Sequence, residues 1–275
     1  MKLHLLLIVL AAASAHYHAR IGVPAAARIW QLENGGETRI TGGLPSYRSL
    51  HPFFAGLLIA LPMNLTSVCG STLLTDTKLI TAGHCWNDGE RQAILFEVVL
   101  ASVRLFTGGT RIITADVVPH EAYVPETIYN DIAMITVPPV QFSELIRPIS
   151  LPVENLFSSH EGRVATVVGY GKTGDASEIT GSQSLRFAFV TVKPKEECAI
   201  YGNLFGASMI CTNGIYGGSC GGDSGGPLFI SERSGEKYLI GVVSYGSAYG
   251  CEAGHPTVFT RISSFIDWIY DKICY

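Results

Sequence analysis

The sequence predicts an all-β protein, built as an antiparallel barrel or sandwich. Short apolar runs recur from residue 40 to the C-terminus, many with β-branched or aromatic residues at alternate positions, and turn signals separate them. No 10–15-residue helical pattern lies between these runs, which argues against a parallel sheet with crossover helices. The 30 glycines and 13 prolines in 275 residues also favour short strands and turns over long helices.

Composition and charge narrow the classes of function. Hydrophobic residues make up 47% of the chain and charged residues 15%, which is typical of a compact globular protein. The formal net charge of −4 offers no basic face to a phosphate backbone, so a nucleic-acid partner is not expected. No stretch is long and apolar enough to span a membrane, so no membrane partner is expected either.

The first 39 residues predict two segments that precede the folded domain. A short basic start, an apolar run and small residues in an A-x-A pattern are typical of a secretory signal peptide, residues 1–15. A buried core helix is the alternative for this run. Residues 16–39, which are small and polar and end at Arg39, are expected to form an activation pro-peptide. The expected location is therefore secreted and extracellular.

Residues 40–275 are expected to form one domain. Its expected strands are 53–61, 71–74, 78–82, 94–100, 111–118, 132–137, 163–168, 185–192, 238–244 and 257–260. One helix is expected at the C-terminus, where Ser264 can cap, Asp267 follows three residues on, and apolar residues repeat at 3- and 4-residue spacing.

Seven cysteines follow the signal peptide, at positions 69, 85, 198, 211, 220, 251 and 274. In a secreted chain an even subset is expected to be bridged, and Cys274, one residue from the end, is the expected odd one. Metal binding is the rival interpretation, but no C-x-x-C or Cys/His ligand spacing occurs, so neither a metal nor another cofactor is expected. Asn64 begins an Asn-Leu-Thr sequon and is a candidate glycosylation site.

The most informative motif is the glycine-rich segment 221–227. Glycine loses the most backbone entropy on folding, so this many glycines together indicate a close approach of the backbone. Three tasks fit the segment. Ser224 can be a nucleophile, the backbone N–H groups of Gly222 and Ser224 can bind an oxyanion, and Asp223 can receive a buried cation.

Two other sequence motifs match known functional sites, but the residues around them do not support those functions. Residues 222–226 match the G-x-S-x-G elbow of α/β-hydrolases, but that fold needs an acid and then a histidine after the serine. Here His255 is the only histidine that follows, and Asp267 lies beyond it. Residues 169–174 spell G-x-G-x-x-G, yet neither a helix pattern nor a ribose-binding acid follows, so a dinucleotide site is not expected.

A serine nucleophile needs a base, and histidine, with an ordinary pKa near 6.5, suits neutral pH. His84 stands out among eight histidines because it ends an apolar strand next to Cys85, whose bridge would fix the backbone. Asp131 directly precedes the apolar run 132–137, where an unpaired carboxylate is unfavourable and a histidine N–H would be a partner. Taken singly, a structural role remains open for His84 and a strand-start cap for Asp131.

Four segments together resemble the chymotrypsin-like serine proteases. They are Arg-Ile-Thr-Gly-Gly at 39–43, Thr-Ala-Gly-His-Cys at 81–85, Asp-Ile-Ala-Met at 131–134 and Gly-Asp-Ser-Gly-Gly-Pro at 222–227. The order His, Asp, Ser agrees, and the resemblance runs from residue 40 to the C-terminal helix. It implies two six-stranded antiparallel β-barrels packed together, with the active site in the cleft between them and a C-terminal α-helix.

The resemblance also implies residue roles. Ser224 would attack the peptide carbonyl, His84 would take and return the proton, and Asp131 would orient the imidazole. The backbone N–H groups of Gly222 and Ser224 would form the oxyanion hole. Family pairing would join Cys69–Cys85, Cys198–Cys211 and Cys220–Cys251 and leave Cys274 alone.

Activation and specificity follow from the same resemblance. A cut between Arg39 and Ile40 would free an amino group that pairs with Asp223. The specificity pocket would include Gly218 at its floor, Gly246 on its wall and Thr257 near its base. None of the three is acidic, so we expect cleavage after large apolar or aromatic residues.

The resemblance therefore implies a digestive endopeptidase, similar to arthropod gut enzymes, that acts as a monomer on protein and peptide substrates. Since a pocket that rejects arginine does not readily cut the Arg39 bond, a separate trypsin-like activator is expected. Protein protease inhibitors are further candidate partners. Thr41, Gly83 and Tyr245 replace the family's usual Val or Ile, Ala and Trp, which leaves the substrate preference open. The alternatives are an elastase-like or broad, collagenolytic protease, and a catalytically silent secreted homologue.

Overall fold

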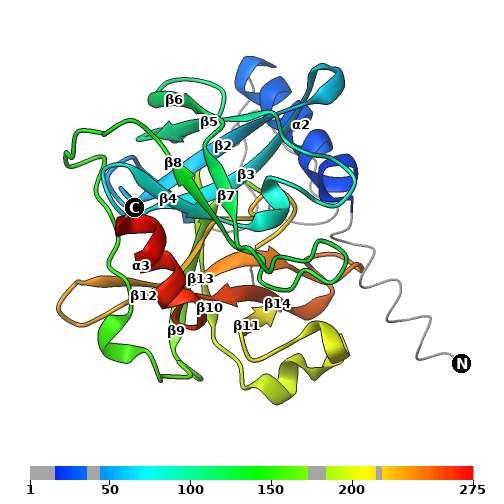
Figure 1. Cartoon of the computed structure of the whole chain (residues 1–275), viewed down its shortest axis with the longest axis vertical. Coiled ribbons are helices and arrows are strands. Elements are labelled where there is room, and N and C mark those ends of the chain that lie inside the picture. The colour runs from blue at the N-terminus through cyan, green and yellow to red at the C-terminus, as the bar shows by residue number, and fades with distance from the viewer. Residues whose placement is uncertain (1–15, 36–43, 173–183, 215–218, 275) are drawn as a thin grey trace, which may run out of the picture.

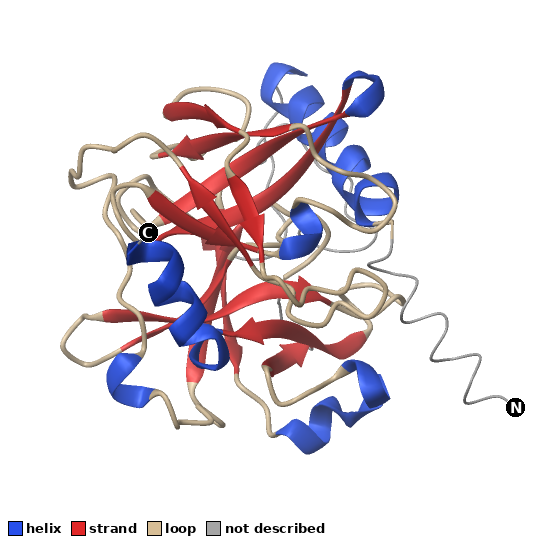
Figure 2. Cartoon of the chain, viewed as in Figure 1, coloured by secondary structure: helices blue, strands red, loops and turns tan. Residues whose placement is uncertain are grey.

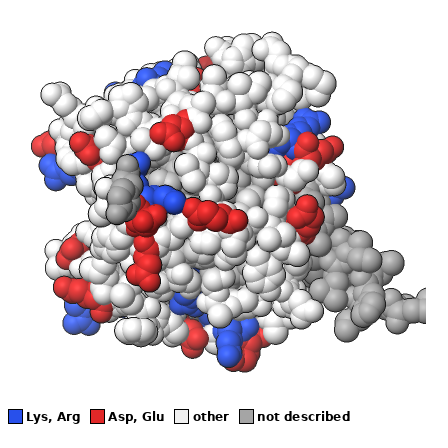
Figure 3. Space-filling model, in the orientation of Figure 1, with Lys and Arg blue, Asp and Glu red and all other residues white. Residues whose placement is uncertain are grey.

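The computed structural model describes residues 16–35, 44–172, 184–214 and 219–274, and consists mainly of two antiparallel sheets (Figure 1). The sheets occupy different halves of the molecule, and most of the helices, including α2 (Val23–Gly35) and α3 (Ile266–Cys274), lie around them (Figure 2). On the face shown in Figure 3, lysine and arginine side chains are scattered among aspartates and glutamates without forming a broad basic area.

The first sheet curls so that its two outer strands are neighbours along the chain. Its strands, in spatial order, are β6 (Thr110–Thr114), β5 (Leu95–Leu100), β2 (Phe54–Leu61), β3 (Leu65–Leu73), β4 (Lys78–Thr81), β8 (Ala133–Thr136) and β7 (Val117–Pro119). Only two residues separate β6 from β7. The Thr114 hydroxyl donates to the Thr136 carbonyl at 2.7 Å, and the Thr136 N–H donates to the Asp116 carbonyl at 2.9 Å. These bonds draw the two ends of the sheet toward each other.

The second sheet is arranged in the same way. Its order is β1 (Leu44–Pro45), β10 (Arg186–Thr191), β9 (Val164–Gly169), β12 (Pro227–Ser231), β13 (Lys237–Tyr245), β14 (Gly254–Arg261) and β11 (Met209–Gly214). An antiparallel bridge between Val192 and Thr212 and a 2.9 Å bond from Lys193 N–H to the Cys211 carbonyl connect the end of β10 with β11. The predicted fold of two antiparallel barrels with a C-terminal helix is thus confirmed.

The number of strands differs from the expectation. Within the described ranges each sheet has seven strands and not six. In the first sheet, the expected single strand 111–118 is divided at residues 115–116, where the chain leaves β5 and joins β8. In the second, the two-residue strand β1 adds to the edge of β10. Strands β11 and β12 were not predicted.

The remaining elements are short helices. They are η1 (His18–Gly22), α2 (Val23–Gly35), η2 (Pro62–Asn64), η3 (Gly83–Cys85), η4 (Val153–Asn155), η5 (Lys195–Leu204), η6 (Ile262–Phe265) and α3 (Ile266–Cys274). Helix α3 is the expected C-terminal helix, and its Ile269 is fully buried. Ser264 lies inside the 3-10 turn η6 and not at the start of the helix, so the predicted cap is wrong. Among the described residues, no helix is long and apolar enough to cross a membrane.

The segment before Arg39 is folded, which its small and polar composition did not predict. Pro24 stands in the first turn of α2, a position at which proline is well tolerated. Ala25, Ala26 and Ile29 are buried and belong to the same apolar cluster as the first sheet. Contacts with β3 hold both η1 and α2. The helix therefore owes its place to packing more than to its own sequence.

Three disulfides join Cys69–Cys85, Cys198–Cys211 and Cys220–Cys251, which are the pairs implied by the resemblance. Cys274 is free and exposed. The first bridge ties η3 to β3, and the third ties the segment before Ser224 to the loop after β13. Both thus restrain the backbone next to the candidate nucleophile and base.

Candidate active site

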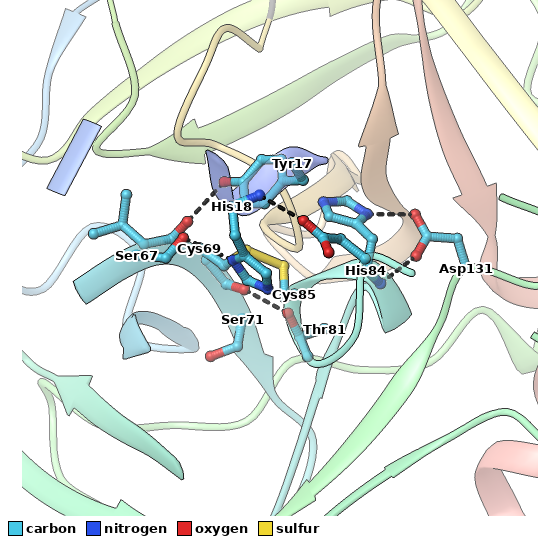
Figure 4. The surroundings of a disulfide bond; sticks show 12 residues. Tyr17, His18, Ser67, Cys69, Ser71, Thr81, His84, Cys85 and Asp131 are labelled. Carbon is cyan, nitrogen blue, oxygen red and sulfur yellow. Dashed lines mark hydrogen bonds and ion pairs between the residues drawn. A yellow bond between two sulfur atoms is a disulfide. The ribbon is translucent and has the colours of Figure 1, made fainter. Parts of the chain in front are cut away.

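His84 and Asp131 meet because of the pairing of β4 with β8. Thr81 at the end of β4 is opposite Ala133 at the start of β8, so the turn η3 that follows β4 lies beside the residues that precede β8. The His84 N–H donates to Asp131 Oδ1 at 2.9 Å, and His84 Nδ1 lies 2.8 Å from Oδ2 (Figure 4). The carboxylate accepts hydrogen bonds, so this contact assigns the proton to Nδ1 and leaves Nε2 as the basic nitrogen.

Two side chains from the second sheet complete the surroundings of Asp131. The Ser244 hydroxyl donates to Oδ2 at 2.5 Å, and the Thr260 hydroxyl donates to the Asp131 carbonyl at 2.7 Å. Asp131 is 1% exposed, and these partners satisfy a carboxylate that would otherwise be unfavourable in the interior. The sequence analysis did not identify either partner, because a lone hydroxyl in an apolar strand carries no recognisable pattern.

Ser224 lies at the junction of the two sheets. The N–H of Gly70 on β3 donates to the Ser224 carbonyl at 2.7 Å, and the Gly225 N–H donates to the Val243 carbonyl on β13 at 2.8 Å. Gly225 has a φ of +78°, and a Cβ there would clash with the Thr81 hydroxyl and the Gly70 carbonyl. The glycines of this motif therefore permit close approach of the backbone, as the sequence indicated.

Asp223 points away from Ser224, toward Gly169 and Gly171. Its Oδ1 accepts from the Gly171 N–H at 2.7 Å and its Oδ2 from the Cys220 N–H at 2.9 Å. Burial raises the pKa of Asp223 to about 6, although these two hydrogen bonds act in the opposite direction. No cation among the described residues pairs with this carboxylate, and the expected partner Ile40 lies outside them, as does Arg39.

A cavity of about 660 Å³ adjoins Ser224. Gly246 and Thr257, the expected wall and base of the specificity pocket, both line it, whereas Gly218 lies outside the described residues. A Cβ on Gly246 would meet nothing within 4 Å, so the wall leaves open space. No aspartate or glutamate is among the described residues that line the cavity.

One occupant of this site was not predicted. The ring of Tyr17, from the segment before Arg39, packs on the His84 ring with 4.6 Å between centroids (Figure 4). The Tyr17 hydroxyl donates to the Val68 carbonyl at 2.7 Å, and Tyr17 lines the same cavity as Ser224. Burial raises the pKa of Tyr17, and the nearby Ser224 hydroxyl opposes that shift. His84 Nε2 is buried and has no hydrogen-bond partner in the described part of the chain.

The other predicted site residues fall in distinct surroundings. Gly222 has a φ of +104°, and a Cβ there would touch Gly171 and Ala25. Asn64 is exposed at the end of η2, where a glycan would have room. Cys69, His84 and Cys85 have potential ligand atoms within 4.8 Å of one another. The two sulfurs are bonded to each other, however, so they are not the thiolates that a metal requires.

Two antiparallel barrels with an oriented histidine–aspartate pair and a serine at their junction define the class of protein: a serine endopeptidase. The comparisons with known proteins agree. The model of the trypsin family matches residues 40–269. The chain belongs to the trypsin family of serine proteases.

Several relatives of similar sequence are arthropod enzymes. Collagenase of Hypoderma lineatum is 35% identical over 247 residues, which cover 88% of this chain and 89% of the relative. Brachyurin of Leptuca pugilator is 35% identical and covers 84% of this chain, and serine protease 1 of Drosophila melanogaster is 34% identical and covers 85%. These matches span 96% and 85% of the two relatives. The solved structure of HL collagenase matches with a TM-score of 0.76 at 33% identity, over 86% of this chain and 99% of that chain.

Proposed function

We propose that this serine endopeptidase is secreted, is made as a zymogen cut between Arg39 and Ile40, and serves digestion. The observation that carries the proposal is the His84–Asp131 pair, joined through both backbone and side chain, at the junction where Ser224 lies. Residues 1–15 are its signal peptide, residues 16–39 its pro-peptide and residues 40–275 its protease domain. It acts on proteins and peptides as a monomer.

The mechanism follows from the protonation of His84. Asp131 holds a proton on Nδ1, so Nε2 is free to take the proton of Ser224 as its oxygen bonds to the substrate carbonyl carbon. The imidazolium then gives that proton to the departing amine nitrogen as the C–N bond breaks, which leaves an acyl-enzyme. Water enters by the same steps in reverse and regenerates Ser224. The N–H groups of Gly222 and Ser224 stabilise the oxyanion.

Activation depends on Asp223. A buried carboxylate without a cation is unfavourable, and here its pKa is raised to about 6. The ammonium freed at Ile40 supplies the missing charge, and pairing with Asp223 shapes the backbone of residues 222–224. The activator is a separate trypsin-like protease, because the cavity offers no carboxylate for an arginine. Protein protease inhibitors are candidate partners of the activated form.

The cavity supports a preference for large apolar side chains. Among the described residues that line it, Gly246 leaves space and no acidic residue is present. Substrates with Phe, Tyr, Leu or Met before the scissile bond fit these surroundings. A collagen substrate is the second candidate, because two of the matches are a collagenase from Hypoderma lineatum and a solved collagenase structure.

The test uses the full chain after cleavage at Arg39 with trypsin, inhibition of the trypsin and removal of the released N-terminal segment. We expect cleavage after Phe, Tyr, Leu and Met in a peptide library, with none from a Ser224→Ala chain treated identically. An Arg39→Gln chain should remain inactive. Cleavage mainly after Lys or Arg, or equal activity of the Ser224→Ala chain, would contradict the proposal. Cleavage of native collagen triple helices would favour the second candidate.

A further inference from the structure

We propose that residues 16–35, called here the pro-segment, are a built-in competitive inhibitor that occupies the catalytic site. The cut at Arg39 alone then does not open the site, and activity requires the pro-segment to dissociate. This inference rests on the proposed function of Ser224 and His84. The family match begins at residue 40, so the pro-segment lies outside the part of the chain that the family model describes.

The first step of the argument is the contact with the catalytic side chains. Tyr17 is 2% exposed, its ring packs on the His84 ring, and it lines the same cavity as Ser224. A substrate carbonyl must approach Ser224 from a position next to His84. The Tyr17 side chain fills that position, so substrate and pro-segment exclude each other.

The second step is the backbone anchor beside Tyr17. The His18 N–H donates to Asp88 Oδ2 at 2.8 Å, and His18 Nδ1 lies 2.9 Å from the Ser67 hydroxyl. Gly22 lies so close to Ser67 that a Cβ there would clash with its Oγ. His18 and Ser67 are both fully buried. The η1 turn is thus fitted to this surface and does not merely lie across it.

The third step is the cover over the pocket and the oxyanion residues. Arg20, Ile21, Pro24 and Ala25 contribute to the lining of the cavity that contains Gly246 and Thr257. A Cβ on Gly221 would lie 3.2 Å from the Ile21 side chain, and one on Gly222 would lie 3.6 Å from Ala25. The pro-segment therefore covers the specificity pocket as well as the nucleophile.

The fourth step is the anchor at the far end of α2. The Glu33 carboxylate accepts hydrogen bonds from the N–H groups of Leu105 and Phe106 and from the Thr107 hydroxyl. At the opposite end, His16 Nδ1 lies 2.6 Å from Glu90 Oε2. None of these contacts involves residues 36–39, so a cut after Arg39 removes none of them. The segment is held from both ends without the covalent link.

The experiment follows the cut chain over time. After trypsin cleaves Arg39 in the full chain and is inhibited, we expect the pro-segment to co-elute with the protease on gel filtration. Activity should rise only on dilution, as the segment leaves. A synthetic peptide of residues 16–35 added back should raise KM and leave kcat unchanged.

Matched variants identify the contacts. Full chains carrying Tyr17→Ala or Gly22→Ala should release the segment about 30-fold more readily and be active at once after the cut. Trp30→Ala is the control, because Trp30 is 54% exposed on α2, and its chain should behave as wild type. The free peptide must form its helix in order to bind, and an isolated short helix is only marginally stable. If the peptide therefore binds weakly, the full-chain variants still test the inference.

The outcomes separate this inference from the proposed function. Full activity of the cut wild-type chain with the segment still bound would overturn the inference. So would the absence of inhibition by added segment, if the Tyr17→Ala chain also behaved like wild type. A chain from which the segment has been removed, but which neither hydrolyses peptides nor reacts with a fluorophosphonate, would instead refute the proposed function.

Discussion

At the residue scale, Asp131 is the point where both sheets contribute to one site. His84 approaches it from the first sheet, and Ser244 and Thr260 approach from the second. The four motifs taken together were sufficient to predict the pairing of Asp131 with His84, through the resemblance that they carry, whereas Asp131 taken singly left a strand-start cap open. The sequence was not sufficient to identify Ser244 and Thr260, since only the packing of the two sheets brings them to the carboxylate.

Replacing Asp131 tests the orientation of the base. In Asp131→Asn the amide accepts less well from Nδ1–H and favours the wrong tautomer of His84, so kcat should fall about 10⁴-fold, the loss measured for this change in the same triad. KM should change little. Steady-state kinetics of the cut chain provide the measurement, with Ser244→Ala as a control that keeps the carboxylate. A loss of less than tenfold would contradict the role given to Asp131.

His18 gives the pro-segment a pH dependence. Burial lowers the pKa of His18 to about 4, with Asp88 acting against the shift and His84 and Arg91 reinforcing it. A lowered pKa means that the contribution of His18 to docking is complete above pH 6.5 and is lost as the pH falls toward 4. Docking should therefore weaken about 20-fold between pH 7 and pH 5.

The measurement is retention of the cut segment by a Ser224→Ala chain on gel filtration at a series of pH values, which requires no catalysis. In His18→Gln the surrounding Asp88, Arg91 and the His16–Glu90 pair remain, so the difference between the two profiles isolates His18. Identical profiles for the two chains would show that His18 has no such effect.

At the element scale, the strands were more predictable than the helices. Runs such as 53–61 and 238–244 match β2 and β13 closely, because a short apolar run bounded by turn signals is typical of a strand buried on both faces, as these two strands are. Strand β12 was missed because it directly follows the glycines around Ser224, which obscure its start. Helix α2 was missed because its apolar face is made of alanines and one isoleucine, and only contact with β3 and the first sheet's core shows that this face is buried.

Glu33 tests whether α2 is held by its far end. A Glu33→Gln side chain keeps the shape but loses the charge that accepts from three donors at 105–107, which should cost about 1.5 kcal/mol. The affinity of the cut segment should accordingly fall roughly tenfold. Isothermal titration of the peptide 16–35 into the Ser224→Ala chain measures this affinity. Gln31→Ala, at an exposed position of α2, is the control. Equal affinities for Glu33→Gln and wild type would contradict the anchor.

At the scale of the whole molecule, activation changes how stability depends on pH. In the uncut chain the pKa of Asp223 is raised to about 6, so the folded state holds this proton more tightly than the unfolded state does. The contribution of Asp223 to stability is therefore complete below about pH 4 and declines as the pH rises through 6. After the cut, pairing with the Ile40 ammonium should remove this decline.

Thermal unfolding of cut and uncut chains between pH 4 and pH 7 measures the effect. Asp223→Asn is the reference, because it lacks the titrating carboxylate. His18 is present in both chains, so its opposite contribution cancels in the difference between the two Tm values. In the uncut form, the Tm of wild type should fall relative to that of Asp223→Asn as the pH rises. In the cut form, this difference should not change with pH. The same decline in both forms would mean that no cation reaches Asp223.

The central claim is that Ser224 is a working nucleophile that becomes accessible once the chain is cut at Arg39 and the pro-segment no longer covers it. Reaction with a fluorophosphonate, followed by mass spectrometry of the labelled peptide, tests this claim most directly. After the cut at Arg39 and removal of the pro-segment, labelling should occur at Ser224 alone and should be absent from the uncut chain and from His84→Ala. Labelling at another serine, or none in a chain shown to be fully cut and folded, would contradict the account.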